Sequence, residues 1–407
     1  MRHTESRSQI DIRKIVIFGA GKIGRSFIGQ LFGSSGYKIV FIDVDPVIIS
    51  LLNERKSYRV VIKGDKEEEI IVRQVQAISA LDKLSVIDAV ATSGIAAVSV
   101  GKNALEKVLP VIASGIEKRY NDNPDKPLDI ILAENMRSAA DFTREQLIKY
   151  LSPGFPVDSY TGLIETSIGK MVPIMPLADA EKDPLMVFAE PYNTLILDGK
   201  GFKSPIPDVK GLAPKNNIKA WVDRKAFIHN LGHATAAYYG FLQHPEAVYM
   251  FEILNDPCVL QFTRDVMIQS AEILLKAYSS EFTFTDLENH IDDLIKRFRN
   301  RALQDTLFRV GHDLQRKLGA DDRFMGSIHL ATQLNMPYEL IIKAMSYGFF
   351  FTARDEEGNL FPADRIFLQS LSEKFETTLT GMLLFNPVYD RKIIIELEKL
   401  YMLNNTL

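Results

Sequence analysis

Short runs of apolar and β-branched residues alternate with helically spaced apolar residues in the first half of the chain. This alternation is typical of a parallel sheet with crossover helices, and it predicts a Rossmann-type, doubly wound, mostly parallel α/β domain. The strand candidates are Lys14–Phe18, Lys38–Asp43, Arg59–Ile62, Ile70–Val75, Asp88–Thr92, Asp129–Leu132 and Met186–Glu190, and the helix candidates are Ile23–Phe32, Pro46–Glu54 and Lys102–Ile116.

The second half of the chain has a different pattern. Glycines and prolines gather at residues 198–207, where the strand signal ends, and the apolar spacing that follows is helical almost throughout. We therefore expect a disordered tail at residues 1–12, the α/β domain at 13–210 and a mainly α-helical C-terminal domain at 211–407. The helix candidates are Ile218–Leu231, Ala234–Gly240, Pro257–Ser279, Phe284–Arg299, Asp305–Val310, Arg323–Leu334, Tyr338–Phe351 and Arg391–Leu400.

Composition and charge narrow the classes of function. The chain has 407 residues, of which 46% are hydrophobic and 25% charged, and this suits two or three globular domains. The formal net charge is -4 and acidic and basic residues are interspersed, so no nucleic-acid-binding surface stands out. Cys258 is the only cysteine, which excludes an intrachain disulfide and a cysteine-built zinc site and favours a reducing, cytoplasmic compartment.

Neither a secretory signal nor a membrane anchor is expected. The first ten residues are polar and lack an apolar middle. The longest nearly apolar stretches, such as 94–100 and 347–352, fall far short of the roughly 20 residues that span a bilayer. The apolar helix faces leave the oligomeric state open, because such a face can pack on its own core or on another copy.

Three glycines stand where the first strand candidate meets the first helix candidate. They lie in the loop GAGKIG, residues 19–24, directly behind an apolar strand. Backbone N–H groups and the helix dipole can hold a pyrophosphate at such a joint. The spacing alone fits a plain turn equally well, but the strand and helix around it favour a dinucleotide site. The candidate contacts are Gly19, Gly21, Lys22, Ile23 and Gly24.

A further candidate contact for the cofactor lies at the end of the second strand candidate. Asp43 follows Gly24 by 19 residues, the position from which a carboxylate accepts hydrogen bonds of an adenosine ribose. A carboxylate repels a 2′-phosphate, and residues 44–46 supply no arginine for one, so NAD is favoured over NADP. Taken alone, Asp43 could equally be a solvated strand-end residue that caps the next helix.

A group of polar residues opens the helical half, within WVDRKAFIHNLGH at 221–233. At about 100° per residue of an α-helix, Lys225, His229, Asn230 and His233 fall within an arc of roughly 140°. A lysine there can accept the proton of an alcohol if burial or a positively charged nicotinamide lowers its pKa. The amide and the imidazole can stabilise a developing alkoxide.

Other interpretations of these residues stay open. Lys225 could be a surface lysine, with Asn230 and His233 at a helix packing seam. His229 and His233, four residues apart, could bind a metal in a lyase or hydrolase, but the glutamate of an HExxH pattern is absent. A non-catalytic NAD-binding sensor is a third alternative, although a sensor has no need of a proton acceptor at Lys225.

Four segments, in order along the chain, resemble the polyol-specific long-chain dehydrogenases and reductases. They are FGAGKIGRSFIG (18–29), LAENM (132–136), RKAFIHNLGHATAAY (224–238) and FRVGHDLQRKLGADDR (308–323). The resemblance covers nearly the whole chain after the first dozen residues. It implies a metal-independent enzyme that uses NAD(H) to interconvert fructose 6-phosphate and mannitol 1-phosphate.

The resemblance also implies roles for individual residues. Lys225 takes the place of the family's general acid/base, and Asn230 and Asn135 take those of the asparagines that stabilise the alkoxide. His233 takes the place of the histidine that orients the substrate oxygen and supports the lysine. Asn135 enters through the resemblance alone.

The chain departs from this family in two segments. Relatives typically carry Asp-Arg-Ile-Val-Pro where residues 169–173 read Gly-Lys-Met-Val-Pro, and an arginine followed shortly by a proline where residues 312–314 read His-Asp-Leu. These departures motivate a second hypothesis, in which the substrate is a hexuronate such as tagaturonate or fructuronate, or an unphosphorylated polyol. The candidate cations for a substrate phosphate, which could equally form a solvated helix face, are Arg309, Arg316, Lys317 and Arg323.

Overall fold

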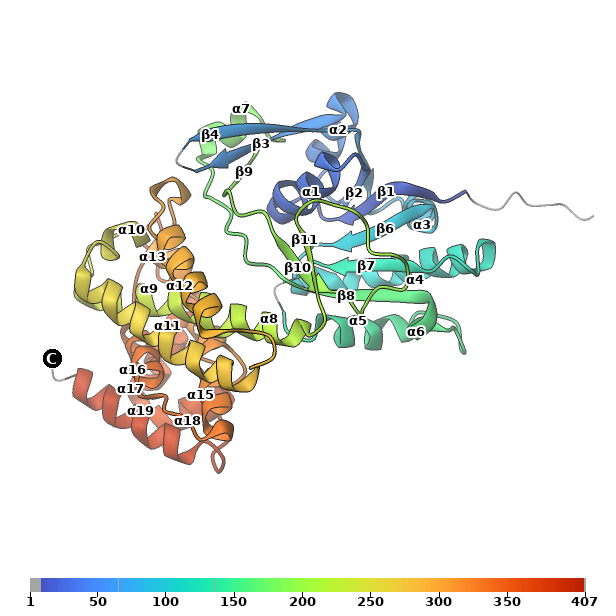
Figure 1. Ribbon diagram of the computed structural model, residues 1–407. Helices are drawn as coiled ribbons and strands as arrows, with labels where there is room; N and C mark the ends of the chain where they lie inside the picture. Colours follow the sequence, from blue (N-terminus) through green and yellow to red (C-terminus); the bar gives the residue numbers. More distant parts are fainter. Residues whose placement is uncertain (1–8, 65, 135, 406–407) are drawn as a thin grey trace, which may run out of the picture. The chain divides into compact units, whose positions relative to one another are not determined.

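The computed structural model describes residues 9–64, 66–134 and 136–405 (Figure 1). The chain forms two compact units that divide between Val222 and Asp223. Residues 1–8 of the expected tail lie outside the described residues. The first strand begins at Asp11, so the last two residues assigned to that tail belong to the strand instead.

The first unit is built on an eight-stranded sheet. Its strands are β1 (Asp11–Phe18), β2 (Lys38–Asp43), β5 (Val75–Ser79), β6 (Ser93–Val98), β7 (Leu128–Leu132), β8 (Thr161–Ser167), β10 (Leu195–Asp198) and β11 (Leu212–Lys215). They are ordered β11-β10-β8-β7-β6-β1-β2-β5, and every neighbouring pair is parallel except β8 with β10. The chain runs outward from β1 in both directions, which confirms the predicted doubly wound, mostly parallel sheet.

From Ile15 to Phe18, β1 is buried on both faces of this sheet. Ile15 and Ile17 belong to one core, and Val16 and Phe18 belong to the other. The first core is covered by η1 (Gly24–Gly29), α1 (Gln30–Ser34) and α2 (Pro46–Arg55). The second is covered by α3 (Lys83–Ala91), α4 (Lys102–Asp122), α5 (Ala139–Ile148) and α6 (Val157–Tyr160).

A small second sheet packs beside the first core. It consists of β3 (Ser57–Lys63), β4 (Glu67–Arg73) and β9 (Val187–Ala189), with β3 in the middle, antiparallel to β4 and parallel to β9. Val60 and Val187 face the core that also contains Ile17. The short helix α7 (Leu177–Lys182) precedes β9.

Several elements differ from the sequence prediction. Residues 88–92, predicted as a strand, belong mostly to α3, whose N-cap Asp82 accepts a hydrogen bond from the backbone N–H of Ser85 (3.2 Å). The strand in that region is β6, which is rich in glycine and alanine and therefore gives a weak strand signal. The predicted strand Ile70–Val75 corresponds to β4, so β5 was not predicted, and neither were β8, β10 and β11. β11 extends the first unit beyond residue 210.

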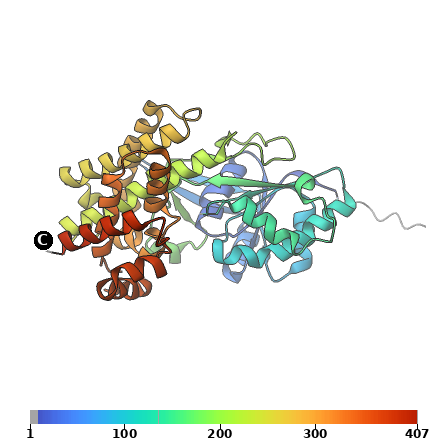
Figure 2. The same ribbon diagram turned by 90° about the horizontal axis from the view of Figure 1, so that it is seen from below.

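The second unit is helical, as the sequence predicts, and Figure 2 shows its helices, coloured yellow-green to red, as a bundle. Within it α9 packs against α10, α11, α13 and α16. Among the described residues, no helix is both long enough and apolar enough to cross a bilayer. The helices are α8 (Ile218–Arg224, which reaches from the first unit into the second), η2 (Lys225–Asn230), α9 (Leu231–Gln243), α10 (Met250–Ile253), α11 (Pro257–Ala277), α12 (Phe284–Phe298), η3 (Arg301–Leu303), α13 (Leu307–Gly311), α14 (Leu314–Lys317), α15 (Arg323–Leu334), α16 (Glu339–Tyr347), η4 (Gly348–Phe350), α17 (Pro362–Glu373), α18 (Phe375–Gly381) and α19 (Arg391–Asn404).

Candidate active site

The loop after β1 is a turn that depends on glycine. Gly19 has a φ of +95°, and a Cβ there would lie 2.6 Å from the carbonyl oxygen of Ser99. A Cβ on Gly24 would lie 2.0 Å from the carbonyl oxygen of Gly19, whereas a Cβ on Gly21 would meet nothing within 4 Å. The turn itself therefore requires Gly19 and Gly24, and Gly21 leaves the backbone open to close approach by a ligand.

A helix begins directly behind this turn. Residues 22 and 23 are helical, and η1 and α1 continue the helix to Ser34. Lys22 is exposed, and Ile23 packs partly buried against the core. The turn lies where the strand order reverses, between β1 and β6, which is the ligand-binding position of open α/β sheets. The backbone N–H groups of this turn are thus suited to hold a pyrophosphate.

Asp43 ends β2 beside the glycine turn. Its Oδ2 accepts a hydrogen bond from the backbone N–H of Ala20 (2.6 Å), and its Oδ1 accepts those of Val44 (2.7 Å) and Asp45 (3.0 Å). The N-cap of α2 is Asp45 rather than Asp43. A carboxylate offers about four lone-pair sites, so the three bonds from described residues leave room on Asp43 for one further donor.

Two residues at the same sheet edge were missed from the sequence. Ser99 follows β6, and its hydroxyl donates to the carbonyl oxygen of Phe18 (3.2 Å). Glu134 follows β7 and is buried; its Oε1 accepts the backbone N–H groups of Val100 (2.8 Å) and Gly101 (3.1 Å), and burial raises the pKa of its carboxyl. These bonds fix the loop after β6 beside the glycine turn. Glu134 lies in the LAENM segment, but the segment does not indicate this contact.

Residues 169–173, the first segment in which the chain departs from the family, contain a buried lysine. Lys170 Nζ donates to Oδ1 of Asn193 (2.8 Å) and Oε1 of Gln30 (3.3 Å), and it lies 5.1 Å from the ring centroid of Phe27. Lys170 is therefore part of the packing of the first unit. Asn135, the candidate for alkoxide stabilisation in this unit, lies outside the described residues.

In the second unit, the lysine and asparagine candidates occupy a π-helical turn rather than the α-helix assumed from the sequence. The turn is η2, in which backbone hydrogen bonds span five residues, as from the N–H of Leu231 to the carbonyl oxygen of Ala226. In an α-helix Lys225 and Asn230 would point about 140° apart. The wider turn moves positions five apart toward the same side, and His233 follows on the first turn of α9.

Lys225 lies in an environment that favours its neutral form. It is half-buried, and desolvation lowers the pKa of its ammonium group to about 8. The positive charges of Arg323 and Arg316 contribute to this lowering, and the carboxylate of Asp322 opposes it. Arg323 also donates from Nη1 to the carbonyl oxygen of Asn230 (3.2 Å), so it supports the end of the π-turn.

His233 is held between a ring and a carboxylate. The imidazole stacks on Phe298, with centroids 4.3 Å apart and planes 5° from parallel. Its Nε2 lies 3.4 Å from Oδ2 of Asp305, which is buried. Burial lowers the pKa of His233, and Asp305 partly opposes this. Asp305 was not predicted as a site residue, because it is distant in sequence and its segment reads as an ordinary helix.

His229 does not form a metal site in the described structure. Its ring is buried beside Phe298, and burial lowers its pKa well below the usual value. The ring centroids of His229 and His233 are 6.2 Å apart. Among residues 9–64, 66–134 and 136–405, no group of three or more histidine, cysteine, aspartate or glutamate side chains is placed to hold a metal ion.

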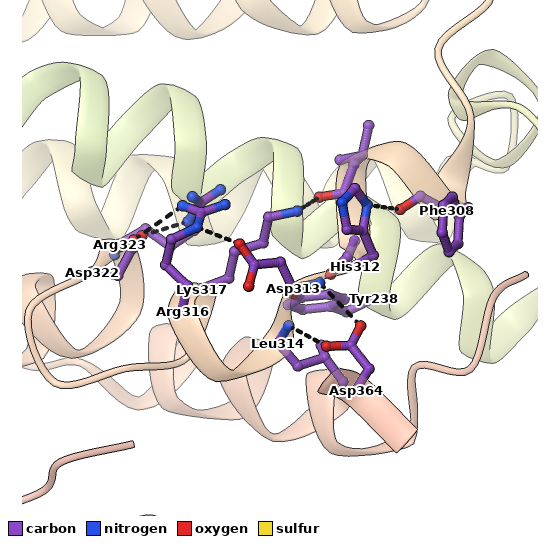
Figure 3. A network of polar contacts seen from close by, with 12 residues as sticks. Tyr238, Phe308, His312, Asp313, Leu314, Arg316, Lys317, Asp322, Arg323 and Asp364 are labelled. Carbon is purple, nitrogen blue, oxygen red and sulfur yellow. Dashed lines mark hydrogen bonds and ion pairs between the residues drawn. The ribbon is translucent and has the colours of Figure 1, made fainter. Parts of the chain in front are cut away.

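Three of the four phosphate candidates form one polar cluster, which Figure 3 shows. Arg316 Nε donates to Oδ2 of Asp313 (2.5 Å), and Arg323 Nε donates to Oδ1 of Asp322 (2.8 Å). Lys317 is buried and donates to the carbonyl oxygen of Val310 (2.5 Å); burial and the two arginines hold its pKa well below the usual value. Within this cluster, Lys317 is thus the cation bonded to a carbonyl rather than a carboxylate.

Residues 312–314, the second segment in which the chain departs from the family, are held in place by hydrogen bonds to a buried aspartate. Buried Asp364 accepts the backbone N–H groups of Asp313 (3.0 Å) and Leu314 (2.7 Å), and the ring of His312 stacks on Phe308 (Figure 3). Burial raises the pKa of the Asp364 carboxyl. The fourth phosphate candidate, Arg309, is bonded to Asp305 through Nε (2.6 Å).

A doubly wound sheet with a glycine turn at its switch point, followed by a helical unit carrying a lysine of lowered pKa, is the architecture of a two-domain dehydrogenase. Two family models match the chain: the mannitol dehydrogenase Rossmann domain at residues 13–211 and the mannitol dehydrogenase C-terminal domain at residues 217–381. The chain belongs to the mannitol dehydrogenase family.

Individual relatives agree with this membership. Mannitol-1-phosphate 5-dehydrogenase of Streptococcus mutans serotype c is 34% identical over 350 residues, 85% of this chain and 89% of the relative. Mannitol 2-dehydrogenase of Pseudomonas fluorescens, solved with NAD and D-mannitol, has a TM-score of 0.72 at 15% identity, covering 98% of this chain and 92% of that one. A substrate-free D-sorbitol dehydrogenase has a TM-score of 0.74 at 16% identity, covering 96% and 94%. These two structures have the same fold as this chain.

Proposed function

We propose that this protein is an NAD-dependent dehydrogenase that interconverts mannitol 1-phosphate and fructose 6-phosphate. The supporting observation in the structure is Lys225, a half-buried lysine with a pKa of about 8. It shares one π-turn with Asn230, and His233 lies on the first turn of the helix that follows. The Streptococcus mutans relative, matched over most of both chains, favours the phosphorylated substrate over a hexuronate or a free polyol.

The residues of the first unit fit NAD. Gly21 leaves space beyond its Cα for a pyrophosphate, and the N–H groups of the glycine turn and of the helix behind it would bind the phosphate oxygens. Asp43 would accept a ribose hydroxyl and would repel the 2′-phosphate of NADP. Bound NAD(H) supplies the hydride acceptor or donor for the substrate carbon.

The residues of the second unit would transfer the substrate's hydroxyl proton and stabilise the alkoxide. Neutral Lys225 would accept the hydroxyl proton of mannitol 1-phosphate, and protonated Lys225 would return a proton to the carbonyl oxygen of fructose 6-phosphate. Asn230 would donate a hydrogen bond to the alkoxide as its charge develops, with Asn135 as a second donor from the first unit. His233 would orient the substrate oxygen.

The cluster around Lys317 is our candidate for the substrate phosphate. Among the described residues, Lys317 donates one hydrogen bond, to a carbonyl, so its other N–H groups would serve phosphate oxygens, and a bound dianion would restore the pKa that burial lowers. Arg316 and Arg323 are also within this cluster but are paired with aspartates. Arg309, bonded to Asp305, would take part only if it left that carboxylate.

A substrate comparison tests the proposal. NADH oxidation is measured at neutral pH with fructose 6-phosphate, fructose and tagaturonate, and kcat/KM is expected to be at least about 10²-fold higher for fructose 6-phosphate, because charge-assisted phosphate contacts add binding energy. A preference for tagaturonate or free fructose would mean that the substrate is the alternative one. No turnover with any of the three would contradict a polyol dehydrogenase.

The pKa of Lys225 predicts opposite pH profiles for the two directions. The kcat/KM for mannitol 1-phosphate oxidation should rise with pH through about 8, because the neutral amine is the base, and that for fructose 6-phosphate reduction should fall. Arg323→Gln removes a positive charge that lowers this pKa, so both midpoints should move to higher pH. Arg316→Gln should move them less in the same direction. Midpoints that stay unchanged in both variants would argue against Lys225 as the titrating group.

A further inference from the structure

Asp305 is placed where it can determine which nitrogen of His233 carries a proton. Its Oδ2 and the Nε2 of His233 are both buried and face each other at 3.4 Å. Among the described residues, neither atom has a hydrogen-bond partner of normal length elsewhere. Contacts of this kind are often long in the absence of substrate and shorten in the reacting complex.

The backbone around Asp305 is fixed from both sides. Its carbonyl oxygen accepts the N–H of Met250 (2.9 Å), and the next residue, Thr306, forms an antiparallel bridge with Tyr249. Thr306 also caps α13 by accepting the N–H of Arg309 (3.1 Å). The carboxylate therefore enters the site from an anchored strand-like segment rather than from a loose loop.

The side chain of Asp305 is anchored too. Arg309 Nε donates to its Oδ1 (2.6 Å), which leaves Oδ2 directed at the imidazole. Although burial alone would raise the pKa of Asp305, His233 and Arg309 outweigh it and the pKa is lowered. Arg309, Lys317 and His229 are the other charged or titratable groups that act on this pair, so the carboxylate is ionised and the imidazole neutral near neutral pH.

We propose that Asp305 is a positioning residue that holds His233 as the Nε2–H tautomer by accepting its hydrogen bond, and that Phe298 fixes the plane of the ring by stacking. The proposal rests on the function proposed above. A neutral imidazole with Nε2–H bonded to Asp305 has a lone pair on Nδ1 and can only accept there. His233 would then accept a hydrogen bond from the substrate hydroxyl or from protonated Lys225, and it would not donate one to the substrate carbonyl.

The test is Asp305→Asn, which keeps the shape and changes the acceptor. In a protein labelled with nitrogen-15 in its histidines, the His233 signal, identified by its loss in His233→Gln, should show Nε2–H in the wild type and not in Asp305→Asn. The kcat/KM for fructose 6-phosphate should fall about 10²-fold with NADH affinity unchanged, because an inverted tautomer disables a correctly placed imidazole. Asp292→Asn, the same change at an exposed carboxylate on α12, should alter neither the tautomer nor kcat/KM.

The outcomes separate the two proposals. An unchanged tautomer in Asp305→Asn overturns the positioning role, even where activity falls, because such a fall would come from packing. If the tautomer is inverted but kcat/KM is unchanged, the tautomer of His233 does not matter for the reaction, and the positioning role of Asp305 is overturned. Absence of wild-type turnover contradicts the proposed function, while the nitrogen-15 spectra still decide the tautomer. A melting temperature within a few degrees of wild type shows that Asp305→Asn is folded. If Asp305→Asn unfolds the protein, the test uses Asp305→Glu, which keeps a carboxylate acceptor and should therefore keep the Nε2–H signal.

Discussion

Replacing Lys225 with alanine is expected to lower kcat for fructose 6-phosphate reduction by about 10³-fold and to leave NADH affinity unchanged. General acid–base catalysis contributes about 10²- to 10⁴-fold, and Lys225 is the group that would deliver the proton. NADH affinity should persist because the glycine turn and Asp43 belong to the first unit. Steady-state kinetics and a fluorescence titration with NADH measure the two quantities.

Two further lysine variants test whether proton transfer by Lys225, rather than its charge or a general effect of losing a lysine, explains this result. Lys225→Arg keeps the charge but cannot give up its proton near neutral pH, so oxidation of mannitol 1-phosphate should be nearly as slow as in Lys225→Ala. Lys392→Ala, at an exposed position on α19, removes a lysine outside the site and should retain wild-type kinetics. If Lys225→Ala kept kcat within about threefold of wild type, another group would have to be the acid/base.

The glycine turn should respond in opposite ways to alanine at its two later glycines. In Gly24→Ala the new Cβ would meet the carbonyl oxygen of Gly19 at 2.0 Å, so the free energy of unfolding should fall by about 3 kcal/mol. In Gly21→Ala the new Cβ meets no protein atom within 4 Å, so stability should stay within about 0.5 kcal/mol while the Kd for NADH rises at least about tenfold.

Denaturant unfolding and NADH titration on the same samples check this pair. Gly381→Ala is the control, because its Cβ would also meet nothing within 4 Å but it lies in the second unit. NADH affinity should stay unchanged, and stability should stay level or rise by up to about 1 kcal/mol, because Gly381 lies in α18 and alanine favours a helix more than glycine does. Unchanged NADH affinity in Gly21→Ala would place the pyrophosphate somewhere other than this turn. Wild-type stability in Gly24→Ala would mean that the turn relaxes away from the carbonyl of Gly19.

The secondary structure was predictable where the apolar pattern of a segment fits only a strand or only a helix. Residues 15–18 of β1 and 39–42 of β2 are continuous apolar runs, and the helices from α11 onward that were predicted carry clear helical spacing, so their positions follow from the sequence. α3 and β6 were confused because residues 88–98 form one apolar stretch, and only the N-cap Asp82 indicates where the helix begins. β8 was missed because its sequence, TGLIETS, contains polar residues that are buried by neighbouring strands.

The candidate site was predictable where its residues are close in sequence. Lys225, Asn230 and His233 lie within nine positions and could be grouped by helical spacing, although the π-turn could not be foreseen from residue types. Asp305 approaches His233 only through the bridge that joins its segment to Tyr249, and Glu134 reaches the loop after β6 only because two parallel strands are neighbours. Such contacts depend on tertiary structure and leave no local signal.

The π-turn at Lys225–Asn230 matters for anyone who wishes to transplant this chemistry. A designer who copied the K-x4-N-x2-H spacing onto an ideal α-helix would send the lysine and the amide about 140° apart, with every residue of the motif present. Deleting one residue between them would bring them to the i, i+4 relation that a regular helix offers, within about 40° of each other. The transferable unit is therefore the motif together with its extra residue in a widened turn.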